Sequence, residues 1–155
     1  MAGVPAVTEL PREREEVVRS VLELRAQPDH VGPPRRFAEH AELFPTAGTA
    51  LEVACGNGSS AVWLAKRGLA VTAMDISTVA IDRAVAMAEE VGVSDRCQFL
   101  ARDLDEGLPD GPPVDTLICH MFRDPALYPA MLDRLAPRGL LAIAVLSEVD
   151  VGPGA

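Results

Sequence analysis

The chain has 155 residues, a net charge of −9, 48% hydrophobic residues and 24% charged residues. That length suits one domain with a sizeable core. Because the balance is acidic and there is no long basic run, we do not expect a nucleic-acid partner, which binds through phosphate neutralisation. The three cysteines are widely spaced and fit neither a disulfide framework nor a zinc site, so no metal is expected.

Neither the amino terminus nor the apolar runs carry a targeting or membrane signal. The first ten residues have no basic start and no apolar core, and no run reaches the roughly 20 apolar residues that a membrane span needs. These features predict a cytoplasmic protein without a membrane partner.

The first third of the chain is expected to be helical. Apolar residues recur at helical spacing within 12–26, and the prolines and glycine after them end this pattern. A second, short helix is expected over 36–44, before Pro45. We therefore assign residues 1–45 to an N-terminal helical cap or lid and residues 46–155 to an α/β core within a single domain.

Strand and helix patterns alternate through the core. Strands are expected at 49–54, 69–75, 97–103, 114–120 and 139–147, and helices at 59–68, 77–92 and 125–137. This alternation predicts a doubly wound α/β fold, with a mainly parallel sheet and helices on both faces. Such sheets bind ligands outside the carboxyl ends of their strands, so polar residues at those ends are the candidate site.

The segment "LEVACGNGSS", residues 51–60, joins the first expected strand to a helix. The overlapping stretch "GNGSSA", residues 56–61, fits the dinucleotide pattern G-x-G-x-x-A. Asp75 ends the next strand, where such folds place a ribose-binding acid. An NAD(P)-binding oxidoreductase is therefore one alternative. Glu52 favours a different ligand, because a carboxylate ahead of the loop would repel a pyrophosphate and suits a positive group.

"LEVACGNG" resembles the first motif of class I S-adenosylmethionine-dependent methyltransferases, with Ala54 in place of the first glycine. The stretches "VTAMDIS", "FLARDLDEGLP" and "VDTLICHMF" resemble the next three motifs in order, and "LAPRGLLAIAV" resembles the turn and strand after them. The resemblance covers roughly residues 34–146. It is greatest for the small-molecule and tellurite-resistance-type branch of the family.

The resemblance implies S-adenosyl-L-methionine as the cofactor and S-adenosyl-L-homocysteine as its product. The carboxylate of Glu52 would then answer the methionine ammonium, helix N–H groups after the loop would receive the methionine carboxylate, and Asp75 would accept from the ribose hydroxyls. Asp103 and Leu104 would contact the adenine. The implied cofactor-binding residues are Glu52, Ala54, Gly56, Asn57, Gly58, Asp75, Ile76, Asp103, Leu104 and Cys119.

The implied reaction is methyl transfer to a small-molecule nucleophile. His120 ends the fourth expected strand, where the acceptor would lie. It is a candidate general base and equally a packed or solvated histidine. Because the sulfonium methyl group is already activated, holding the nucleophile in line can support the transfer without a catalytic residue.

One departure from the family concerns the end of the chain. The family usually adds an antiparallel hairpin after the fifth strand, whereas this chain stops at "SEVDVGPGA". The expectation is a fragment, a partner chain over the edge, or lost activity, so a catalytically silent or partner-dependent cofactor-binding module is a further alternative. Strand 139–147 holds no charge and no proline, which predicts self-association through its edge.

Overall fold

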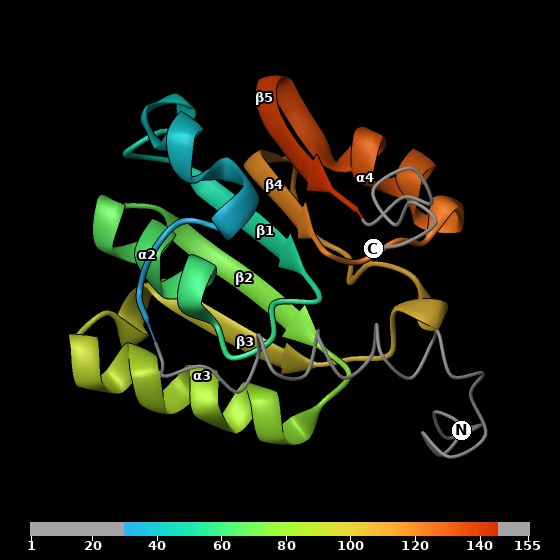
Figure 1. Ribbon diagram of the computed structural model, residues 1–155. Helices are drawn as coiled ribbons and strands as arrows, with labels where there is room; N and C mark the ends of the chain where they lie inside the picture. Colours follow the sequence, from blue (N-terminus) through green and yellow to red (C-terminus); the bar gives the residue numbers. More distant parts are fainter. Residues whose placement is uncertain (1–29, 146–155) are drawn as a thin grey trace, which may run out of the picture. The chain divides into compact units, whose positions relative to one another are not determined.

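The computed structural model describes residues 30–145 (Figure 1). The expected helix at 12–26 and the last two residues of the expected strand 139–147 lie outside the described residues. Contacts divide the chain into two compact units, Met1–His30 and Val31–Ala155, and the sheet belongs to the second unit.

Five parallel strands form a single sheet in the order β3-β2-β1-β4-β5. Figure 1 shows them side by side, with β1 at the centre. This order confirms the doubly wound α/β fold. The strands are β1 (Thr49–Val53), β2 (Ala70–Asp75), β3 (Cys97–Ala101), β4 (Val114–His120) and β5 (Leu135–Ala144).

Helices cover both faces of the sheet, as expected for a parallel sheet buried on both sides. Side chains of α2 and α3 pack with alternate β1, β2 and β4 residues in one core, while α4 packs with the other residues of these strands in a second core. The α-helices are α2 (Ser59–Arg67), α3 (Thr78–Val91) and α4 (Tyr128–Arg134). The shorter 3-10 helices are η2 (Arg35–Leu43), η3 (Ser94–Arg96), η4 (Leu104–Glu106) and η5 (Pro125–Leu127).

The prediction of a helix over 125–137 is wrong at its carboxyl end. The structure breaks that segment into η5 and α4, and β5 begins at Leu135. Pro137 explains the early stop, because proline removes a helical N–H and pushes the residue before it into an extended conformation. A bulge comes next, with Arg138 at φ 66, before β5 resumes its pairing with β4 at Leu140.

The segment before β1 packs with the sheet unit. η2 replaces the expected helix at 36–44, and its Phe37 packs against the core beneath α2 and α3. The ring of Phe44 lies edge-on to Trp63 of α2, with 5.4 Å between ring centroids. Arg67 donates to the Phe44 carbonyl and lies over the Trp63 ring. Residues 31–45, assigned to the cap from the sequence, thus belong to the same compact unit as the sheet.

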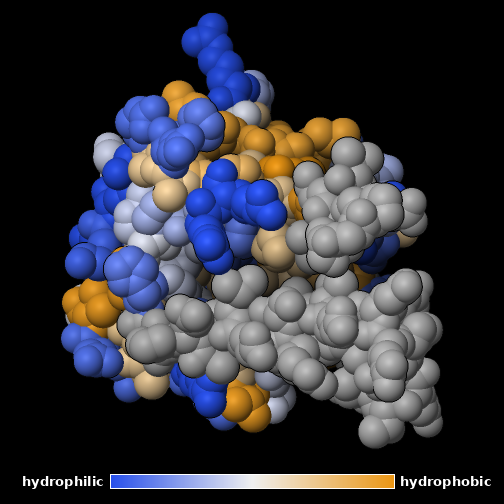
Figure 2. Space-filling view, in the orientation of Figure 1, coloured by the Kyte–Doolittle hydropathy of each residue, from blue (hydrophilic) through white to orange (hydrophobic). Residues whose placement is uncertain are grey.

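Apolar residues also reach the surface. In Figure 2 they gather at the top of the view, where Figure 1 places β5. Among the described residues no helix is both long enough and apolar enough to cross a membrane.

Candidate functional site

The loop between β1 and α2 has an unusual backbone. Three of its residues have positive φ: Ala54 at 52°, Gly56 at 57° and Gly58 at 84°. Glycine enters this region without strain, whereas an alanine there crowds its Cβ against the backbone. The sequence motif therefore marks a loop whose shape depends on left-handed residues, and Ala54 adopts that shape without the usual glycine.

The two glycines serve different purposes. A Cβ on Gly58 would lie 2.6 Å from the Cβ of Ala84, so the missing side chain lets the start of α2 pack against α3. A Cβ on Gly56 would meet nothing within 4 Å. Gly58 is thus required for packing, while Gly56 leaves open space above the loop at the carboxyl edge of the sheet.

Asp75, the last residue of β2, holds this loop. It is 2% exposed, and its two carboxylate oxygens accept the backbone N–H groups of Gly56 and Ser77, each at 2.9 Å. The residue expected to bind ribose therefore also ties the glycine loop to β2. Each oxygen keeps a further lone pair, so these bonds leave room for a ligand hydroxyl.

Glu52 is buried within β1, where it is 4% exposed. Its Oε2 atom has no hydrogen-bond partner among the described residues. Burial, with a smaller contribution from the Asp75 carboxylate, raises the pKa of Glu52 to about 8. A buried acid of this kind is costly to ionise unless a positive group approaches it.

The residues expected near the adenine lie at the ends of β2 and β3. Ile76 comes directly after β2 and is 46% exposed, so its side chain offers an apolar surface at this end of the sheet. Asp103 caps η4 by accepting the N–H of Asp105 at 2.9 Å, and Leu104 is buried. All three residues thus lie at the carboxyl edge of the sheet, and Asp103 has the helix-capping role that was the alternative to adenine binding from the sequence.

At the end of β4, Cys119 and His120 face opposite sides of the sheet. Cys119 is fully buried, its Sγ donates to the Phe122 carbonyl, and its pKa is raised to about 11, chiefly by burial. His120 is half-buried, and its Nε2 has no partner among the described residues. Its ring lies edge-on to Phe37 of η2, at 5.8 Å between centroids. Burial and the nearby Arg36 guanidinium lower the pKa of His120, so the imidazole is neutral at neutral pH.

The contact of Phe37 with His120, and the closeness of the Arg36 charge to the same residue, were not expected from the sequence. The pattern predicted a helical segment there, but the partner of an isolated helix cannot be read from periodicity. The sequence feature that could have indicated this contact is the pair Arg35 and Arg36 beside Phe37, at the start of that helix.

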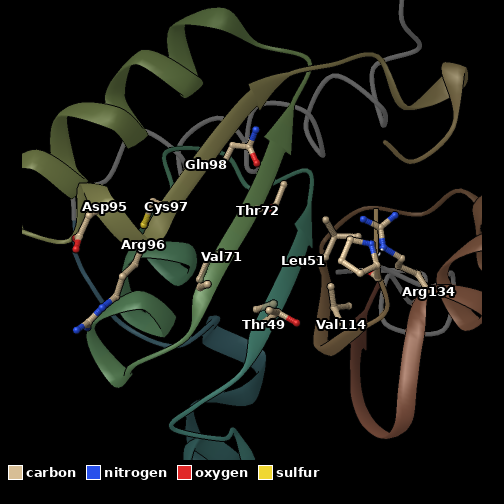
Figure 3. Close-up of a pocket in the computed structure, with 13 residues that line it drawn as sticks. Thr49, Leu51, Val71, Thr72, Asp95, Arg96, Cys97, Gln98, Val114 and Arg134 are labelled. Carbon is tan, nitrogen blue, oxygen red and sulfur yellow. Dashed lines mark hydrogen bonds between the residues drawn. The ribbon is translucent and has the colours of Figure 1, made fainter. Parts of the chain in front are cut away.

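A separate hollow of about 280 Å³ opens at the opposite edge of the sheet (Figure 3). It lies beside the first residues of four strands: Thr49, Ala70, Cys97 and Val114. Its arginine side chains bind backbone carbonyls, Arg134 those of Pro109 and Pro112, and Arg96 that of Ala65. Since ligands of open α/β sheets bind at the carboxyl ends of the strands, we place the candidate site there and not in this hollow.

Known proteins share the segments that build the carboxyl edge of the sheet. A family model described as "Methyltransferase domain" matches residues 50–139, which include the glycine loop, Asp75 and Asp103. Over 111 residues the chain is 34% identical to the tRNA 5-carboxymethoxyuridine methyltransferase of Escherichia coli K12, covering 66% of this chain and 42% of that protein. The chain thus spans less than half the length of this curated relative.

Solved structures share the fold. One is an S-adenosylmethionine-dependent methyltransferase from Thiobacillus denitrificans in complex with S-adenosyl-L-homocysteine, with a TM-score of 0.63, 21% identity, and coverage of 85% of this chain and 54% of that one. Another is the C-terminal domain of precorrin-6Y C5,15-methyltransferase from Rhodobacter capsulatus, with a TM-score of 0.66, 19% identity, and coverage of 79% and 70%. With the family model matching more than half of its residues, the chain belongs to the methyltransferase-domain family.

Proposed function

We propose that this chain binds S-adenosyl-L-methionine and takes part in methyl transfer to a small-molecule nucleophile. The observation that carries the proposal is the buried Glu52 carboxyl, with an oxygen that no described residue satisfies. An acid in this place fits the cationic amino-acid end of S-adenosylmethionine and opposes the phosphates of a dinucleotide. Family membership points the same way and away from the oxidoreductase alternative.

The residues at the carboxyl edge fit this cofactor. Gly56 leaves space for a ligand to approach the backbone, and α2 begins at Ser59 with N–H groups that favour a carboxylate. Asp75 has lone pairs left for ribose hydroxyls, and the exposed Ile76 offers an apolar surface to an adenine ring. Cys119 would contribute through its backbone, since its side chain is buried in the core between the sheet and α4.

S-adenosylmethionine supplies a methyl group on a positively charged sulfur, which makes that carbon electrophilic. The chain then has to bind and orient the cofactor and the methyl acceptor, and to exclude water from them. The loop and its acids would hold the amino-acid and nucleoside ends, and Phe37 of η2 lies against His120 at the end of β4. A neutral His120 can accept a hydrogen bond from an acceptor hydroxyl, amine or thiol, but holding the nucleophile in line can support the transfer without it.

The class of acceptor has a second candidate. The relative from Escherichia coli is named as a tRNA methyltransferase, so net charge alone does not exclude a nucleic-acid acceptor. We retain a small molecule because the chain is acidic, and no long basic run is present to hold a phosphate backbone.

Ligand binding tests the cofactor. S-adenosylhomocysteine at 100 times its dissociation constant is expected to add about 2.7 kcal/mol to the unfolding free energy, seen as a raised melting temperature, whereas NAD and NADP should add nothing. Binding of nicotinamide cofactors without S-adenosylhomocysteine would end the proposal.

Transfer is tested with S-adenosylmethionine carrying a labelled methyl group, incubated separately with a small-molecule extract and with total tRNA. Label in the small-molecule fraction supports the proposal, and label in tRNA assigns the other acceptor. Cofactor binding without transfer to either would favour a silent or partner-dependent module.

A further inference from the structure

We propose that Arg102 is a positioning residue for adenine recognition: its guanidinium group holds the turn after β3 in shape, so that Asp103 and Leu104 are in place for the adenine ring before the cofactor arrives. The inference rests on the proposed function and deepens it, because Arg102 is not among the residues that the family resemblance implied for cofactor binding.

Arg102 lies between β3 and η4, and both its backbone and its side chain are bound. Its N–H donates to the Asp75 carbonyl at 2.9 Å, which extends the pairing of β3 with β2 beyond the end of β3. Its Nε donates to the Gly107 carbonyl at 2.8 Å, and its Nη2 donates to the Glu106 carbonyl at 3.3 Å. The side chain therefore joins the two ends of segment 102–107, and the backbone joins this segment to the strand that carries the expected ribose acid.

The turn itself has few other bonds. It follows the tip of the β3 arrow in Figure 1, at the carboxyl edge of the sheet, and its helical part η4 is three residues long. Asp103 caps η4 by accepting the N–H of Asp105 at 2.9 Å. So short a 3-10 helix is weak in isolation, because its hydrogen bonds have poor geometry. Arginine donors at the last carbonyls of a helix stabilise that end, so Arg102 supplies order that the turn would otherwise lack.

The bonds of Arg102 leave the groups expected at the adenine unoccupied. Within residues 30–145, neither the Oδ2 atom of Asp103 nor the N–H of Leu104 has a hydrogen-bond partner. The first can accept from an amino group and the second can donate to a ring nitrogen, and adenine presents these two groups on one edge. Because the guanidinium group binds carbonyls, it fixes the turn without pairing with the Asp103 carboxylate.

An ordered turn recognises a base better than a mobile one. When the acceptor and the donor are already in place, the binding free energy is not spent on ordering them. A lysine in place of Arg102 would keep the positive charge, but its single ammonium group lacks the planar fork that reaches two carbonyls at once. The order of the turn, and with it the recognition of adenine, should therefore depend on the guanidinium group and not on charge alone.

The test compares S-adenosylhomocysteine with S-inosylhomocysteine, in which an oxygen replaces the adenine amino group. In calorimetry the wild-type chain should bind the adenine ligand roughly tenfold more tightly, because the second ligand offers the Asp103 carboxylate no donor. Arg102→Lys should lower the affinity for S-adenosylhomocysteine and bring the two ligands close to equal affinity. Loss of this preference is a readout that a merely structural role would not change.

Arg134→Lys is the matched control. Arg134 also binds two carbonyls, those of Pro109 and Pro112, but it lines the hollow at the opposite edge of the sheet (Figure 3). This variant should lose stability in urea and keep both the affinity for S-adenosylhomocysteine and the preference for adenine.

A second measurement uses only the wild-type chain and so does not depend on any variant folding. The N–H groups of Glu106 and Gly107 donate to the carbonyls of Asp103 and Leu104. If the turn is ordered before binding, these two N–H groups should exchange with solvent at least about tenfold more slowly than in an unstructured peptide, with no ligand present.

The outcomes separate the two proposals. An unchanged preference for adenine in Arg102→Lys, equal binding of the two ligands by the wild-type chain, or unprotected N–H groups in the free turn would each overturn the role of Arg102. All three leave the cofactor assignment intact. If the wild-type chain does not bind S-adenosylhomocysteine, both proposals fail.

Discussion

The carboxylate of Asp75 accepts the backbone N–H of Gly56 at 2.9 Å, across 19 residues of sequence. This bond joins the end of β2 to the loop after β1. A residue expected to serve only the ligand therefore also shapes the protein that holds the ligand, so its effects on stability and on affinity are coupled.

Replacing Asp75 with alanine should lower both the stability of the fold and the affinity for the cofactor. Two backbone N–H groups lose a charged acceptor, and each such bond contributes about 1.5–3 kcal/mol, so unfolding in urea should show a loss of about 3 kcal/mol or more. Affinity for S-adenosylhomocysteine should also fall at least tenfold. Asp82→Ala, at an exposed acid on α3, is the control and should change neither. Native stability in Asp75→Ala would contradict the loop-holding role.

Ala54→Gly should stabilise the chain. Alanine at φ 52 carries strain of roughly 1–2 kcal/mol, and glycine removes it while adding entropy to the unfolded chain. The expected net gain is up to about 1 kcal/mol in urea unfolding. Ala54→Val, with a branched Cβ, should lower stability by more than the glycine raises it. A less stable glycine variant would show that the surroundings favour the alanine side chain.

The two loop glycines should separate stability from binding. Gly58→Ala places a Cβ 2.6 Å from Ala84 at φ +84 and should destabilise by roughly 2–4 kcal/mol. Adding Ala84→Gly should restore part of that loss. Gly56→Ala meets no neighbour within 4 Å, so it should cost only about 1 kcal/mol of strain but reduce cofactor affinity strongly. Equal losses of stability in the two single variants would contradict this division.

Much of the fold could be predicted because it depends on local patterns. Apolar runs of strand length alternate with helical stripes, and this alternation was enough for the parallel sheet and for α2 and α3. The segment 125–137 failed because its apolar residues suit either a helix or a strand. There the chain ends α4 at Arg134 and begins β5 in response to Pro137 and the pairing with β4.

Candidate site residues could be named from the sequence, but their contacts could not. Residues at strand ends meet at one edge of a parallel sheet, which is why Glu52, Asp75 and Asp103 could be named as candidates from their spacing. That Asp75 binds the glycine loop, or that Phe37 lies against His120, depends on contacts between distant segments. No periodicity encodes such contacts.

The raised pKa of Glu52 predicts an unusual dependence of stability on pH. An acid with a pKa of about 8 when folded and 4.5 when unfolded binds more protons in the folded state between these values. Unfolding free energy should therefore fall as the pH rises from 5 to 8, by at most about 1.4 kcal/mol per unit from this group. Glu52→Gln, compared with the wild-type chain in urea at several pH values, should lose that decline. A decline that persists in the variant would assign it to another group.

The edge at β5 should control association. Within residues 30–145, β5 pairs on one side only, with β4, and its segment 140–144 is entirely apolar. Pro137, Arg138 and the bulge protect only the first residues of β5, which the sequence-based strand 139–147 did not include, so the apolar edge over 140–144 is free to pair with other copies. We expect the 155-residue chain to form concentration-dependent oligomers in size-exclusion chromatography with light scattering. Ala144→Lys, which places a charge at the end of β5, should shift them toward monomer.

Leu132→Lys provides the matched control for that variant. Leu132 lies on α4 and is 59% exposed, so the substitution adds the same charge and removes more surface apolar area, yet leaves the strand edge intact. If association runs through β5, this variant should oligomerise like the wild-type chain. Equal dissociation in both variants would point to general surface hydrophobicity, and a wild-type monomer at high concentration would show that the β5 edge is already protected.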